Sequence, residues 1–168
     1  MLNQQPSLCS CCANLGETCC QGREIYITPG DQRRISTVAQ SLPFVVWRRP
    51  TDPIYLGQSN DPLWQRHVFC KDGSRRTLKT KPNGDCIFLS TRGCRLPVEI
   101  RPLLCRLHPF TYTANGIDRE PDLGCPRHLL ADGESVFDAT GTPWSLALTW
   151  HHQLYEEILT DLHDDRTD

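Results

Sequence analysis

Cysteine is the residue whose spacing indicates the most chemistry in this chain of 168 residues, which contains ten of them. Five lie in the first twenty residues: Cys9, Cys11, Cys12, Cys19 and Cys20. The others are Cys70, Cys86, Cys94, Cys105 and Cys125. Because reactivity rather than packing usually decides where cysteine is placed, this clustering predicts sulfur chemistry. The options are disulfide bonds, a metal or iron–sulfur centre, and thiol redox catalysis.

The start of the chain helps to separate these options. Residues 1–8 show no basic segment followed by an apolar run, which is the pattern of an export signal. We therefore expect a cytoplasmic protein, in which thiols are kept reduced. A chain of this length can also bury a core without disulfide bonds. Reduced, clustered thiols favour metal binding over disulfides or thiol catalysis.

Composition narrows the class of partner. The formal net charge is −2, with 18 Lys and Arg against 20 Asp and Glu, so we expect neither nucleic acid nor a membrane as partner. No apolar stretch approaches the ~20 residues that span a bilayer. The 13 prolines and 11 glycines indicate many turns and short elements. We expect a single loop-rich domain over residues 1–168.

Short elements must position the cysteines. Thr28, Pro29 and Asp31 form the pattern of a capped helix start, and the helix is expected to turn Ile35, Val38 and Ala39 inward and to end before Pro43. Two hairpins are predicted. One joins residues 75–81 to 85–90 across Asn83-Gly84, and the other turns at Asn115-Gly116. Pro102 is expected to begin a helical turn that presents Cys105.

The C-terminal segment is predicted to be the longest helix, over about residues 143–163. Apolar residues recur there at helical spacing: Leu146, Ala147, Trp150, Leu154, Ile158 and Leu162. The fold class expected is α+β: short hairpins and helices organised around a cysteine cluster and closed by this amphipathic helix.

The cysteine spacing limits how a metal could be bound. Cys9-x2-Cys12 has the spacing of a metal knuckle, and Cys11 offers a second register. Adjacent side chains such as Cys19 and Cys20 rarely reach one tetrahedral ion, so one of them is expected to face a first metal and the other a second metal or the core. The downstream spacing matches no zinc finger or ribbon. Those ligands must converge through tertiary structure.

Read in order, several motifs resemble one family. They are Cys9-x2-Cys12, Cys19-Cys20-Gln21-Gly22, Ile25-x-Ile27-Thr28-x2-Asp31-x2-Arg34-Ile35, Gly84-Asp85-Cys86-Ile87-Phe88-Leu89, Gly93-Cys94-Arg95-Leu96, Arg101-Pro102-x2-Cys105-Arg106-x-His108-Pro109-Phe110 and Cys125-Pro126. Together they resemble the CxxCxxCC cysteine-cluster family, the YkgJ-type zinc- or iron-chelating domain, to which the flagellin lysine N-methylase is related. The likeness covers roughly residues 9–128.

The resemblance implies a domain in which eight cysteines bind zinc, iron or a 4Fe–4S cluster. The matching positions are Cys9, Cys12, Cys19, Cys20, Cys86, Cys94, Cys105 and Cys125. Both kinds of centre use the same thiolates, so zinc and iron–sulfur remain open. Cys70 has no counterpart and is expected to be a buried apolar thiol beside Val68 and Phe69.

Three arginines lie beside these cysteines in the sequence: Arg95, Arg101 and Arg106. Each could donate hydrogen bonds or positive charge to a ligating sulfur, or simply pair with surface carboxylates. His108 is expected to pack rather than to ligate.

The function expected from these observations is a non-catalytic, metal-binding role in structure, sensing or metal handling, with no protein partner identified. No zincin, nucleotide-binding or nucleophile-elbow motif is found. An iron–sulfur enzyme such as a protein-lysine N-methyltransferase, or a thiol-redox protein, remains the alternative.

Overall fold

The computed structural model describes residues 8–16, 18–56, 60–121 and 125–161, apart from the side chain of Cys9. These residues form an α+β domain with small antiparallel sheets. In order, the helices and strands are α1 (Leu8–Leu15), α2 (Pro29–Ala39), β1 (Val45–Arg48), α3 (Pro62–Val68), β2 (Arg75–Leu78), β3 (Leu89–Ser90), β4 (Gly93–Cys94), α4 (Leu103–Leu107), β5 (Phe110–Thr113), β6 (Gly116–Pro121), α5 (Val136–Thr140) and α6 (Trp144–Leu159). Single 3₁₀ turns are formed by Pro53–Tyr55 and Arg127–Leu129.

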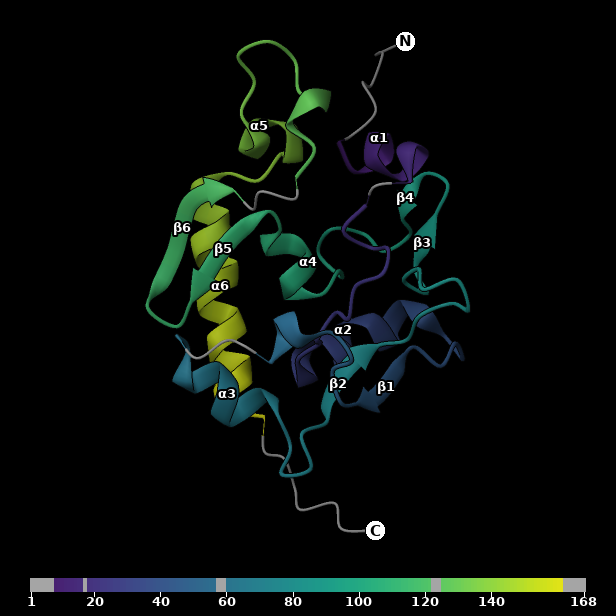
Figure 1. Cartoon of the computed structure of the whole chain (residues 1–168), viewed down its shortest axis with the longest axis vertical. Coiled ribbons are helices and arrows are strands. Elements are labelled where there is room, and N and C mark those ends of the chain that lie inside the picture. The colour runs from purple at the N-terminus through teal and green to yellow at the C-terminus, as the bar shows by residue number, and fades with distance from the viewer. Residues whose placement is uncertain (1–7, 17, 57–59, 122–124, 162–168) are drawn as a thin grey trace.

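Helix α6 is the longest helix of the described residues, which confirms the predicted C-terminal helix. Its inner face buries Ala147, Trp150, Leu154 and Ile158 in a core cluster with residues of α3, α4 and β5. Leu146 was expected on this face but is 38% exposed. Leu162 lies outside the described residues. Figure 1 shows α6 running along the molecule, with the β5–β6 hairpin on one side and α3 near its end.

Helix α2 begins as the sequence predicts. The Thr28 hydroxyl accepts a hydrogen bond from the Asp31 amide, and the Asp31 carboxylate accepts one from the Thr28 amide, which completes the capping box. Ile35 is fully buried in a second core cluster with Ile27, Leu78 and Phe88. The prediction was wrong for Val38, which is 44% exposed.

The first predicted hairpin is only partly present. The turn exists, because Lys81 donates its amide to the Asp85 carbonyl and Gly84 has the positive φ of +88° that favours glycine. Thr80 also forms an antiparallel bridge with Cys86, but β2 itself pairs with β1, with Val45 opposite Leu78. The sequence prediction missed β1, and with it the stronger partner for β2.

Two further predictions are confirmed. Strands β5 and β6 form the hairpin at Asn115-Gly116, and α4 follows directly after Pro102. Helices α1 and α5 lie together at one end of the molecule, away from β1, β2 and α3 (Figure 1). Within the described ranges, no helix has the length and apolar character needed to cross a membrane.

Candidate metal centre

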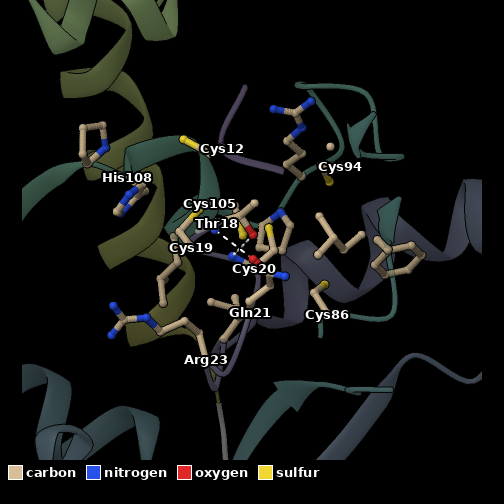
Figure 2. Close-up of a pocket in the computed structure, with 18 of the residues that line it drawn as sticks. Cys12, Thr18, Cys19, Cys20, Gln21, Arg23, Cys86, Cys94, Cys105 and His108 are labelled. Atoms are coloured by element: carbon tan, nitrogen blue, oxygen red, sulfur yellow. Dashed lines mark hydrogen bonds between the residues drawn. The ribbon is translucent and has the colours of Figure 1, made fainter. Parts of the chain in front are cut away.

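Seven cysteines line a single cavity of about 550 Å³. They come from distant parts of the sequence: Cys12, Cys19, Cys20, Cys86, Cys94, Cys105 and Cys125. Figure 2 shows Cys86 and Cys94 on one side of Cys20, and Cys12, Cys19 and His108 on the other. None of these seven is in a disulfide bond. The fold therefore brings together every predicted ligand except Cys9, whose side chain lies outside the described residues.

Two of these cysteines are held at the end of the molecule formed by α1 and α5. Cys12 lies in the middle of α1, and Cys125 begins the segment that leads to α5. Both are buried in a small apolar cluster with Leu8 and Val136. We call these four residues the amino-terminal cluster.

A short backbone pairing joins Cys20 to Cys86. The Cys86 amide donates to the Cys20 carbonyl over 2.7 Å, and Gln21 forms an antiparallel bridge with Asp85. At the same place the Gly22 amide donates to the Gly84 carbonyl. The double cysteine of the amino-terminal segment is thus held against the turn that carries Cys86.

Cys94 and Cys105 complete this side of the cavity. Cys94 is the second residue of β4, and its register partner in β3 is Leu89. Cys105 is carried by α4, whose first amide, that of Leu103, donates to the buried Asp31 carboxylate over 3.0 Å. Asp31 therefore caps α2 and also fixes the start of the helix that presents Cys105.

Four thiols interact with one another electrostatically: Cys20, Cys86, Cys94 and Cys105. Burial raises the pKa of Cys86 to about 11, and it raises the pKa values of Cys94 and Cys105 as well. For Cys20, the hydrogen bond with Cys19 is the largest cause of a strongly raised pKa, and burial is the next. Without a metal, these thiols are neutral at pH 7. A bound cation would replace their protons.

The adjacent cysteines Cys19 and Cys20 lie at the same cavity. Side chains of neighbouring residues were expected to diverge, with Cys19 and Cys20 facing different surroundings. Both line the same cavity, and their thiols are hydrogen-bonded to each other. The Cys20 amide donates to the Thr18 hydroxyl and the Thr18 amide to the Gln21 side chain, so a tight turn holds both thiols toward the cavity (Figure 2).

The three arginines have different surroundings. Arg101 lines the cavity, hydrogen-bonds to the Cys94 thiol and donates its Nε to the Leu96 carbonyl over 2.9 Å. Arg95 is exposed and donates to the Ile87 carbonyl. Arg106 donates to the carbonyls of Glu99 and Arg101. Of these three side chains, Arg101 is the one that contacts a candidate ligand, Cys94.

Residues that were not predicted as ligands also contribute to the surroundings of the cavity. The charge of Lys81 lowers the pKa of Cys86, partly opposing burial, while its ammonium group donates to the Leu89 carbonyl over 2.7 Å. Tyr112 and His108 line the cavity. The local sequence offered no signal for Lys81, because its place near Cys86 follows from the turn at residues 81–85.

Cys11 and Cys70 lie apart from the cavity lining. Cys11 lies in α1 next to Cys12 but does not line the cavity, so the alternative register of the knuckle gains no support. Cys70 also lies outside the lining. It is half-buried rather than fully buried, and its backbone closes the turn at residues 70–74.

The thiols are not arranged around a single point. Among the described side chains, no group of three or more His, Cys, Asp or Glu residues is positioned to hold a metal ion. A tetrahedral zinc site with Zn–S bonds of about 2.3 Å holds its sulfurs about 3.8 Å apart. The cavity is far larger than one such ion needs.

Comparison of the chain with protein-family models, with curated proteins and with solved structures found no match. The resemblance to the CxxCxxCC family therefore rests on the motif residues themselves.

Proposed function

We propose that this protein binds a metal centre through the cysteine thiolates that line the cavity, and that its role is structural, sensing or metal handling rather than catalytic. The observation that supports the proposal most directly is the convergence of seven cysteines, from residue 12 to residue 125, on one cavity. Several thiols in one place are the donor set of zinc or of an iron–sulfur cluster.

The thiol chemistry argues for ligation rather than redox catalysis. The nucleophile in thiol catalysis is the thiolate, so a catalytic cysteine has a lowered pKa. Here burial raises the pKa values of Cys86, Cys94 and Cys105 instead. A metal ion or cluster supplies the positive charge that makes several buried thiolates tolerable.

The size of the cavity favours an iron–sulfur cluster over a single zinc ion. When bound, such a cluster would supply redox activity or a rigid cross-link between distant segments. Its four cysteine ligands would come from the seven lining cysteines, with Arg101 donating to one of the sulfurs.

The test is elemental analysis of protein purified without oxygen. We expect a brown protein with iron and acid-labile sulfide. A colourless protein with stoichiometric zinc would keep the metal-binding role and exclude the cluster. Protein that contains neither metal, and takes up neither on reconstitution while remaining folded by circular dichroism, would refute the proposal.

A further inference from the structure

A second, smaller cavity lies where the β5–β6 hairpin meets α5 and the start of α6. It has a volume of about 160 Å³ and is lined by Phe110, Arg119, Phe137 and Trp144. We call these four residues the aromatic hollow. Figure 1 shows the first turns of α6 beside β5 and β6, with α5 at the same end of the molecule. Phe110 also lines the cysteine cavity, so the two cavities share one wall.

The three aromatic side chains of the hollow hold one another in place. The rings of Phe110 and Phe137 are stacked, with centroids 4.3 Å apart and planes inclined by 12°. The Trp144 ring is tilted by 53° against Phe110, at a centroid distance of 5.9 Å. Phe110 is buried, whereas Phe137 and Trp144 are only partly buried. Ring faces and edges therefore remain available to a further aromatic group, which favours this kind of contact.

The volume of the hollow fits a single ring. An apolar cavity of about 150 Å³ holds a benzene molecule, whereas the sites of drug-sized ligands occupy about 300–1,000 Å³. A ligand of one aromatic ring with a short substituent is therefore the size that the hollow accepts.

Arg119 brings a positive charge to the hollow. Its guanidinium carbon lies 4.6 Å from the centroid of the Trp144 ring. The side chain is exposed, and no carboxylate of the described residues forms an ion pair with it. A guanidinium that lies on an aromatic face still has its fork of N–H donors, which matches the two oxygens of a carboxylate.

An irregularity in the hairpin accompanies this position of Arg119. Phe110 and Tyr112 of β5 are separated by one residue, but their partners in β6, Pro121 and Ile117, are separated by three. Arg119 is the middle one of those three residues. A bulge of this kind changes the direction in which a side chain points and is common next to functional sites.

The carboxylates nearest in the sequence have other partners. Asp118 accepts a hydrogen bond from the Glu120 amide over 3.0 Å. Asp138, which follows Phe137, completes the capping box of α5 with Ser135. The first turn of α6 contains no acidic residue. A carboxylate brought by a ligand would therefore meet little competition for Arg119.

We propose that the aromatic hollow binds a small aromatic carboxylate, whose ring packs against Phe137 and Trp144 and whose carboxylate pairs with Arg119. The site is separate from the proposed metal centre, and its occupation requires no metal.

The experiment titrates the full-length, isotope-labelled protein with benzoate and follows the indole N–H signal of Trp144 by NMR. We expect a saturable shift with a dissociation constant of about 1 mM or below. Benzylamine has the ring without the negative charge, and cyclohexanecarboxylate has the charge without the aromatic ring. Both should bind more weakly than benzoate. No shift of the Trp144 signal at benzoate concentrations well above this constant, or equal affinity for all three compounds, would overturn the proposal.

A pair of variants tests the role of Arg119. Arg119→Gln changes an exposed residue and is expected to weaken benzoate binding by about 10-fold, because a hydrogen-bonded charge pair is lost. Arg95→Gln is the matched control, because it removes an exposed arginine that does not line the hollow, and it should leave the affinity unchanged. Equal affinities of the two variants would overturn the assignment of Arg119. Since the titration needs no metal, its failure leaves the proposed metal binding untouched, and the two failures are distinguishable.

Discussion

Arg101 is the arginine that the fold brings to a cysteine sulfur. Its planar guanidinium binds the Leu96 carbonyl and the Cys94 thiol together, and a lysine ammonium lacks the fixed fork needed for both contacts. We therefore expect Arg101→Lys to weaken metal binding by about 10-fold and to shift the absorption of the loaded protein. Competition with a chelator of known affinity measures the first effect.

Arg95→Lys is the matched control, because Arg95 is exposed and contacts the Ile87 carbonyl rather than a sulfur. Its metal affinity and spectrum should equal those of the wild type. Equal effects of the two substitutions would mean that the contact with Cys94 has no influence on the centre.

A comparison of Cys70 with Cys94 tests whether metal binding depends on the position of a thiol or only on the number of thiols in the chain. It is a free, half-buried cysteine outside the cavity lining, so Cys70→Ser is expected to leave the metal content nearly unchanged. Cys94→Ser removes a thiol that lines the cavity, and it should lower the metal content. Metal analysis of both purified variants checks this. A similar loss in the two variants would show that Cys70 also serves as a ligand.

At the level of elements, the contact between α2 and α6 can be tested at Gly30. A methyl group added there would collide with the carboxylate of Glu157. That carboxylate is held by Arg34 at 2.6 Å and by Gln153 at 2.8 Å. Although alanine is favoured over glycine in a helix by up to about 1 kcal/mol, we expect Gly30→Ala to destabilise the fold by about 1–3 kcal/mol. Urea unfolding measures the difference.

The same substitution in a Glu157→Ala background provides the control. Once the carboxylate is removed, Gly30→Ala should be neutral or stabilising, because only the helix preference remains. A loss of stability of the same size in both backgrounds would indicate that the collision is not the cause.

The helices and turns that depend on short sequence patterns were predicted correctly. The capping box at Thr28, the turn at Asn115-Gly116 and the helix after Pro102 depend on residues a few positions apart, and all three are present. The pairing of β2 with β1 was missed, because it joins segments about thirty residues apart and depends on burial. Short patterns of turn residues carry no information on such a partner.

The candidate site was likewise predicted only in part: its residues were found from the sequence, but their arrangement was not. The cysteines were recognised from their residue type, and the structure brings seven of the eight to one cavity. Their arrangement within it could not be derived from spacing, because it depends on the pairing of Cys20 with Cys86 and on the contact of Asp31 with α4. The role of Lys81 depends on the same tertiary contacts.

For the whole molecule, the proposed metal binding predicts that the small amino-terminal cluster needs metal to stay folded. Its fully buried set is Leu8, Cys12, Cys125 and Val136, and so little apolar area stabilises the contact between α1 and α5 only weakly. We expect chelation to make this end of the molecule sensitive to protease, while α6 and its core stay protected. Mass spectrometry of the fragments locates the cuts. An unchanged cleavage pattern with and without chelator would contradict this.

A non-catalytic role for the whole protein also makes a prediction about small molecules. Calorimetry with S-adenosylmethionine on the metal-loaded protein should show no saturable binding. Micromolar affinity at a stoichiometry of one would instead favour the methyltransferase alternative, and a titration of S-adenosylhomocysteine would then show whether the site accepts the product of methyl transfer.

The cysteines that line the cavity are synthesised at very different times, because they lie far apart in the sequence. Cys12, Cys19 and Cys20 are made first, Cys86, Cys94 and Cys105 follow, and Cys125 comes last. If the cavity binds metal as proposed, the early thiols stay reduced and without metal until most of the chain has been made. We therefore expect correct assembly of this protein to depend on a reducing environment, and an oxidising pulse to damage newly made chains more than mature ones.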